Sequence, residues 1–107
     1  MGRSTTQRVV NELKKIKKRF MKTYKIEKML LFGSRARAEE LITSDVDVII
    51  VSPDFGTIPF RKRPNKFLDA WKLSVDLEVL CYSPEEFKRK QKEYGLVRVA
   101  AKEGRLI

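Results

Sequence analysis

Two aspartates that alternate with valines are the residues of this chain best suited to carry out chemistry. Asp45 and Asp47 begin the run Asp-Val-Asp-Val-Ile-Ile-Val, which ends at Val51. In an extended strand alternate side chains point to the same face, so both carboxylates project from one side. Two such negative charges repel each other, and a divalent cation between them lets both stay ionised. The pair therefore predicts a metal site at the beginning of a strand.

A glycine and a serine end the apolar run that precedes this strand. Gly33 and Ser34 follow Leu30–Phe32, and Asp45 comes after a spacer of ten residues. Glycine lets the backbone turn sharply, and a helix that starts near the serine would direct free N–H groups at an anion. Two arginines follow the turn and can neutralise phosphate charge. The predicted nucleotide-binding residues are Gly33, Ser34, Arg35 and Arg37.

An Asp-x-Asp pair by itself is weak, because an aspartate at a strand start is often only a turn former. The order of apolar strand, Gly-Ser, ten-residue spacer, Asp-x-Asp and second apolar strand resembles the signature of the DNA polymerase beta-like nucleotidyltransferase superfamily. More narrowly, the segment Gly33–Arg37 and the short chain resemble the minimal nucleotidyltransferases, the small partners of HEPN-domain proteins in prokaryotes. One departure is Ala38, where many relatives have glycine.

A third acidic residue is expected on a later strand. Alternation along Ser74–Tyr82 puts Asp76 and Glu78 on one face. In the superfamily the third acid lies on a strand of this kind, so the resemblance assigns it to Asp76. Glu78 remains the alternative for that role. The predicted catalytic and metal-binding residues are Asp45, Asp47 and Asp76.

The resemblance implies transfer of a nucleoside monophosphate, in the simplest case AMP from ATP, to a hydroxyl group. Two Mg²⁺ ions, or Mn²⁺, would stabilise the attacking and leaving oxygens. Minimal nucleotidyltransferases are antitoxins that AMPylate a tyrosine of a HEPN toxin. Two other functions stay open: an antitoxin that acts by binding alone, and a nucleic-acid-binding module that acts through a basic surface. Assembly as a homodimer or as a hetero-oligomer also stays open.

Length and composition limit the number of domains, the kinds of active site and the partners that can be expected. The 107 residues suffice for one domain, residues 1–107, without a separate substrate-binding domain. There is no histidine, which excludes His-dependent triads and leaves oxygen ligands for a hard cation. The net charge of +10 favours ATP or another nucleoside triphosphate, RNA, or an acidic protein as partners. No run is apolar enough for a membrane span or a secretion signal, so a cytoplasmic protein is expected.

The periodicities predict an α/β fold, with a mixed sheet of three to four strands flanked by helices. A helix is expected from Thr5 to Tyr24, capped by Ser4, and its outer face carries a stripe of lysines that is either solvated or a partner surface. The short segment Arg35–Leu41 favours helix. A solvated loop is expected between Ser52 and Pro64, although its Arg61-Lys62-Arg63 cluster could also meet triphosphate. Further expected strands are Ile26–Phe32, Asp45–Val51, Ser74–Tyr82 and Arg105–Ile107, and further helices are Asn65–Leu73, Pro84–Tyr94 and Leu96–Lys102.

Overall fold

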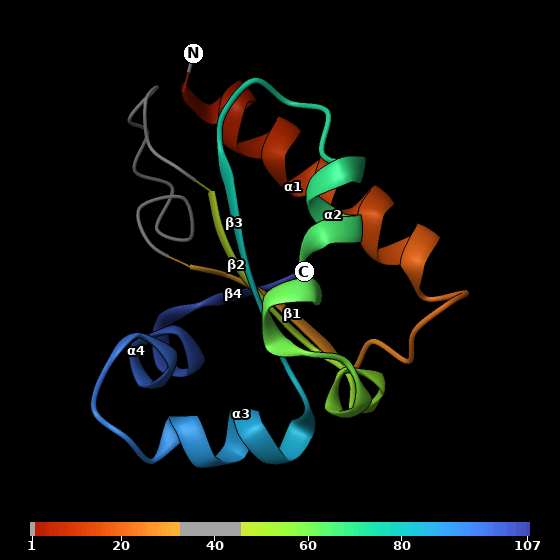
Figure 1. The fold of residues 1–107 in the computed structure, drawn as a ribbon. Helices are drawn as coiled ribbons and strands as arrows, with labels where there is room; N and C mark the ends of the chain where they lie inside the picture. Colours follow the sequence, from red (N-terminus) through yellow and green to blue (C-terminus); the bar gives the residue numbers. More distant parts are fainter. Residues whose placement is uncertain (1, 33–45) are drawn as a thin grey trace.

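The computed structural model describes residues 2–32 and 46–107 and folds them around a four-stranded sheet (Figure 1). The strands are β1 (Lys28–Phe32), β2 (Val46–Val51), β3 (Leu77–Tyr82) and β4 (Arg105–Leu106), in the spatial order β3-β2-β1-β4. β1 is antiparallel to β2 and β4, whereas β3 is parallel to β2. The predicted mixed sheet flanked by helices is confirmed, and the parallel pair places the beginnings of β2 and β3 side by side.

The helices are divided between the two faces of the sheet. α1 (Gly2–Phe20) and α2 (Asn65–Ala70) cover one face, and α3 (Pro84–Gln91) and α4 (Leu96–Glu103) cover the other (Figure 1). Because side chains alternate along a strand, Val48 is buried on the α1 side while Ile49 is buried on the α3 side. None of the described helices is both long and apolar enough to cross a membrane.

The first helix begins and ends earlier than its sequence pattern predicts. It starts at Gly2, so Ser4 lies within its first turn and does not cap it. It ends at Phe20, and the N–H of Tyr24 then donates to the Phe20 carbonyl at 2.7 Å while the two rings stack. This turn keeps Tyr24 against the core but leaves Met21 54% exposed.

The segment before β3 also differs from its prediction. Regular pairing with β2 begins at Leu77, so Asp76 precedes the strand, although its carbonyl still accepts the N–H of Val46 at 2.8 Å. α2 ends at Ala70, and Trp71 packs against the core with its indole N–H donating to the Val75 carbonyl at 2.7 Å. Trp71 is thus a core residue, and its hydrogen bond fixes the turn that leads into β3.

The connection between β2 and α2 contains a buried arginine that forms an ion pair with α3, so the predicted solvated loop is wrong for Arg63. This segment forms two short 3₁₀ helices, η2 (Pro53–Thr57) and η3 (Phe60–Lys62). The Arg63 guanidinium, 6% exposed, donates to both carboxylate oxygens of Glu86 at 2.6 and 3.2 Å. It also donates to the carbonyls of Ile58 and Cys81, which satisfies the buried charge and fixes the connection to the start of α3.

The Arg63–Glu86 pair should make the stability of the fold depend on pH in the acid range. The hydrogen bond from Arg63, aided by the Ser83 N–H, lowers the pKa of Glu86 from 4.5 to about 2, although partial burial opposes the shift. Because folding lowers this pKa, the ionised carboxylate stabilises the fold above pH 4.5, and this contribution is lost as the pH falls toward 2. We expect Glu86→Gln to lower the free energy of unfolding by about 3 kcal/mol at neutral pH.

Urea unfolding followed by circular dichroism, at neutral pH and at several acid values, measures this difference. The difference between the wild type and Glu86→Gln should shrink toward the acid end. Glu85→Gln is the matched control, because Glu85 is exposed and has no ion-pair partner among the described residues. A difference that stays constant down to the lowest pH would contradict the assignment to the Glu86 carboxylate.

Candidate active site

Five of the predicted site residues lie outside the part of the chain that the structure describes. These are Gly33, Ser34, Arg35, Arg37 and Asp45, and the short helix predicted over Arg35–Leu41 lies there too. Their roles in phosphate and metal binding stay predictions. The described strands on either side nevertheless fix where this segment leaves and rejoins the sheet, at the end of β1 and at the beginning of β2.

Asp47 and Glu78 lie opposite each other on the two parallel strands. They are Cα partners in the register of β2 and β3, and residues paired in this way point to the same face of a sheet. Asp76 precedes Glu78 by two residues, and the hydrogen bond from Val46 to its carbonyl continues the pairing, so it belongs to the same face. Asp47 is half-buried, and the other two acids are exposed. The structure thus brings Asp47, Asp76 and the alternative Glu78 to one end of one face.

An apolar layer borders the acids on this face. Phe32, the Cα partner of Asp47 on β1, is buried together with Leu30 and Ile49 beneath α3 and α4. Farther along β2 the same face continues with Val51, which is also buried. The carboxylates therefore stand where the packed layer ends and solvent begins. The paired backbone of β2 and β3 holds them in position at this edge.

The donor atoms at this end suit a hard divalent cation. The chain has no histidine, and Cys81 lies on the opposite face, where burial raises its pKa to about 12 and keeps the thiol protonated. Carboxylate oxygens remain, and these are the ligands that Mg²⁺ and Mn²⁺ prefer. Within residues 2–32 and 46–107, no three acidic or cysteine side chains form a metal-binding group. The predicted set of three acids includes Asp45, which lies outside these ranges.

Comparison with known proteins relates this arrangement to a family. The model of a family described as "Nucleotidyltransferase domain" matches residues 13–107. Two relatives from Methanocaldococcus jannaschii, each named "putative protein adenylyltransferase", are 38% identical over 80 residues and 39% identical over 74 residues. The first alignment covers 71% of this chain and 91% of the relative, and the second covers 68% and 76%.

A solved structure gives the same result at the level of the fold. The crystal structure of a "putative nucleotidyltransferase" from Sulfolobus solfataricus matches with a TM-score of 0.64 and 25% sequence identity, over 82% of this chain and 78% of that one. The chain therefore belongs to the nucleotidyltransferase domain family. Within the DNA polymerase beta-like superfamily it is a minimal nucleotidyltransferase, as the Gly-Ser and Asp-x-Asp segments of its sequence predict.

Substitution can decide which exposed acid completes the site. We expect Asp47→Asn to reduce nucleotidyl transfer by more than about 100-fold. The substitution removes a carboxylate that would hold Mg²⁺, and with it the positive charge that stabilises the phosphate oxygens in the transition state. Asp76→Asn should cause a loss of similar size, and Glu78→Gln should retain most of the activity. Initial rates with labelled nucleoside triphosphate measure the three variants.

Asp69→Asn serves as the control, since Asp69 is exposed on α2, which covers the other face of the sheet. All four variants should keep the melting temperature of the wild type within a few degrees, because none of the four residues is fully buried. If Glu78→Gln lowers the activity more than Asp76→Asn does, Glu78 and not Asp76 is the third catalytic acid.

Proposed function

We propose that this chain is a protein adenylyltransferase, which transfers AMP from ATP to a hydroxyl group of another protein. The observation that carries the proposal is the 38–39% identity to two relatives of that name, one of them aligned over 91% of its length. The acids at the beginnings of β2 and β3 support it, because this reaction needs carboxylates on a rigid scaffold beside a triphosphate.

In this reaction the acceptor oxygen attacks the α-phosphorus of ATP and pyrophosphate leaves. Asp45, Asp47 and Asp76 are the residues that would hold two Mg²⁺ ions. Bound Mg²⁺ supplies positive charge for the oxygens that become negative. Gly33 and Ser34 would hold the β- and γ-phosphates through backbone N–H groups and the serine hydroxyl, and the arginines that follow would neutralise them. Asp76, exposed at the solvent edge, can accept the proton of the acceptor hydroxyl.

The acceptor that we propose is a tyrosine of a HEPN-domain toxin, which would make the chain the antitoxin of a cytoplasmic toxin-antitoxin pair. The resemblance of Gly33–Arg37 to the minimal nucleotidyltransferases supports this partner. In this proposal the acceptor protein supplies part of the recognition surface itself, within a hetero-oligomer.

Intact-mass spectrometry tests the reaction directly. We expect incubation of the chain with Mg²⁺, ATP and a HEPN-domain protein encoded beside it to add one or more AMP units to that protein. The addition should disappear with Asp47→Ala and on removal of Mg²⁺ by a chelator, because both changes remove the charge neutralisation that the triphosphate needs. Tight binding of the two proteins without any mass gain, with each of the four nucleoside triphosphates, would favour an antitoxin that acts by binding alone.

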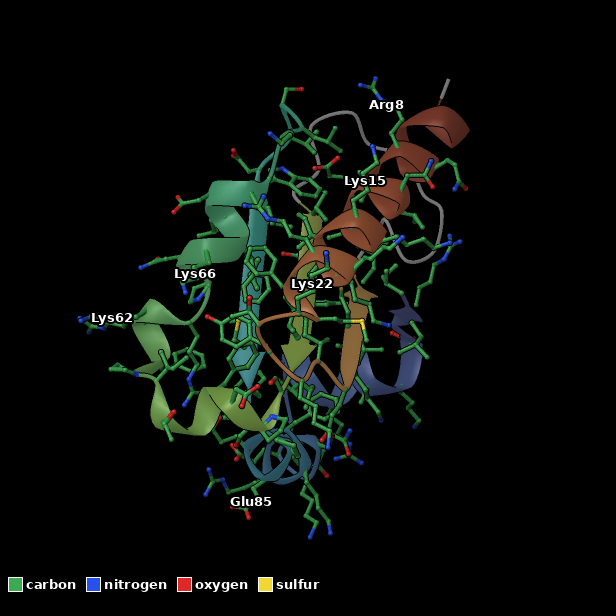
Figure 2. The ribbon with its side chains drawn as sticks, turned by 90° about the vertical axis from the view of Figure 1, so that its right-hand side faces the viewer. Arg8, Lys15, Lys22, Lys62, Lys66 and Glu85 are labelled. Atoms are coloured by element: carbon green, nitrogen blue, oxygen red, sulfur yellow. The ribbon has the colours of Figure 1, made fainter. Side chains whose placement is uncertain are left out.

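A second candidate, RNA binding, is favoured by the basic surface of α1. Figure 2 shows Arg8 and Lys15 along the outer side of this helix and Lys22 in the turn after it, with Lys66 of α2 and Lys62 of η3 in the same view. Within the described residues, no acidic side chain forms an ion pair with any lysine or arginine of α1. No aromatic residue interrupts the stripe, so contact with phosphates is favoured over base stacking. The exposed basic residues of α1 and the turn after it are Arg8, Lys14, Lys15, Lys18, Arg19 and Lys22.

Lys17 does not belong to this surface. Its ammonium donates to the backbone oxygen of Ile107 at 2.7 Å, so it connects α1 to the end of the chain next to β4. Charge reversal at Lys17 would therefore disturb the fold as well as the surface, and it is unsuitable as a test of binding. Lys15 of α1 and Lys22 of the turn after it, both exposed, are the better choice.

Salt dependence distinguishes phosphate contacts from a merely solvated helix face. If both lysines contact phosphates of single-stranded RNA, Lys15→Glu with Lys22→Glu should weaken binding and lower the slope of log affinity against log salt by about 1.4. Fluorescence anisotropy with a labelled RNA across several KCl concentrations measures this slope. Lys88→Glu with Lys92→Glu is the control of equal charge change, on exposed residues of α3 and the turn after it. Equal effects of the two pairs would attribute binding to net charge alone.

A further inference from the structure

A cavity of about 410 Å³ opens between the second half of β3 and α3. Leu80 and Tyr82 contribute from β3, and Phe60 contributes from η3. The wall on the other side comes from α3, with Glu86, Arg89 and Lys90. Two aromatic rings and an aliphatic side chain therefore face a more polar rim, which is the usual composition of a small-molecule site.

This cavity lies on the same face of the sheet as the acids. Glu78, Leu80 and Tyr82 alternate along β3 and so point to one side, and Glu78 is level with Asp47. With the rise of an extended strand, Leu80 is about 7 Å and Tyr82 about 13 Å beyond Glu78. A ribose and its α-phosphate span a gap of this size. A nucleotide whose phosphates lie at the acids can therefore place its base in the cavity.

Phe60 offers a surface on which a base can stack. Its side chain is 47% exposed, so part of the ring is open to solvent beside the cavity. Its ring centroid is 5.6 Å from that of Tyr82, and the buried guanidinium of Arg63 lies 5.5 Å from the ring. The ring is thus held in place by its neighbours while part of it stays open to a ligand. Arg89 is exposed at the rim and has no ion-pair partner among the described residues.

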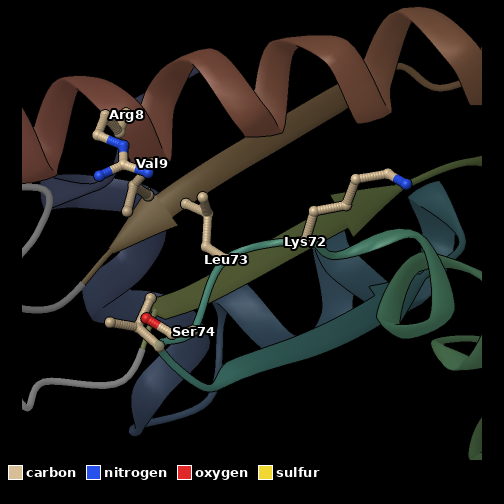
Figure 3. A pocket seen from close by; sticks show the side chains of 6 residues that line it. Arg8, Val9, Lys72, Leu73 and Ser74 are labelled. Atoms are coloured by element: carbon tan, nitrogen blue, oxygen red, sulfur yellow. The ribbon is translucent and has the colours of Figure 1, made fainter.

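A second cavity, between α1 and the segment before β3, does not fit a base as well. Arg8 and Val9 of α1 line it together with Leu73 and Ser74 (Figure 3), and its volume is about 290 Å³. It lies on the α1 side of the sheet, because Val9 and the neighbouring Val75 belong to the core beneath that helix. Its described walls contain no aromatic ring, and the sheet separates it from the face of Asp47.

We propose that the cavity between β3 and α3, here called the base pocket, binds the base of the nucleoside triphosphate by stacking on Phe60. The phosphates then extend along β3 toward Asp47 and Asp76. This inference rests on the proposed function for the identity of the ligand. It adds a role for η3 and α3, two elements that the Gly-Ser and Asp-x-Asp segments do not include.

Binding of ATP and of inorganic tripolyphosphate, each with Mg²⁺, tests the proposal by isothermal titration calorimetry. Phe60→Ala should weaken ATP binding about 10-fold, because stacking on an aromatic ring is lost, and should leave tripolyphosphate binding unchanged. Phe60→Trp should retain ATP binding, since it keeps an aromatic ring. Tyr94→Ala is the control, because Tyr94 is an aromatic residue that is 91% exposed and lies outside the pocket.

The possible outcomes separate this inference from the proposed function. If the wild type binds ATP and Phe60→Ala binds it equally well, the base pocket is wrong while the adenylyltransferase stands. If Phe60→Ala instead lowers only modification of the partner protein, the cavity receives the acceptor and the base pocket is again overturned. If the wild type binds neither ATP nor tripolyphosphate, both proposals fail. Equal loss of ATP and tripolyphosphate affinity would place phosphates in the cavity, which also overturns the inference.

Discussion

The parallel pairing of β2 with β3 is the constraint on which the rest of this structure depends. Parallel neighbours need a long crossover, and here the chain from η2 through η3 and α2 makes it. The pairing sets Asp47 level with Glu78 and brings Asp76 against the start of β2. An antiparallel arrangement would place the end of β3 there, with Tyr82 in place of the acids. The acidic end of the sheet is therefore a consequence of strand direction.

The crossover is held in place at its middle by Arg63. Its guanidinium reaches Glu86 of α3 and the carbonyl of Cys81 on the edge strand, so three elements meet at one buried charge. A buried arginine is tolerated only when its donors are satisfied, and the four hydrogen bonds described above achieve this. The same contact positions η3, and hence Phe60, beside β3. The ion pair thus shapes the wall of the cavity as well as stabilising the fold.

The two sides of the sheet have different surface chemistry. On the α3 side, acids stand at the end of an apolar layer that continues toward the cavity. On the α1 side, the helix presents lysines to solvent while Leu13 and Ile16 fill the core beneath it. A polyanion attracted to the α1 side would therefore not compete directly with a nucleotide at the acids, and the net charge of +10 would favour both.

The family and most of the strands and helices could be predicted from the sequence alone, because they depend on local spacing. Apolar runs, the Gly-Ser segment and the alternation of Asp47 with valines predict strands and a candidate site without knowledge of contacts. Contacts between distant residues could be known only from the folded chain. They include the register that sets Glu78 beside Asp47, the burial of Arg63, and the opening of a cavity at Phe60. These features depend on residues that are far apart in the chain. No local sequence pattern links Arg63 to Glu86, and the two meet only because the crossover folds back against α3. Local periodicity predicts the face of the sheet to which a side chain points, but the pairing and register of the strands determine which residues lie next to it.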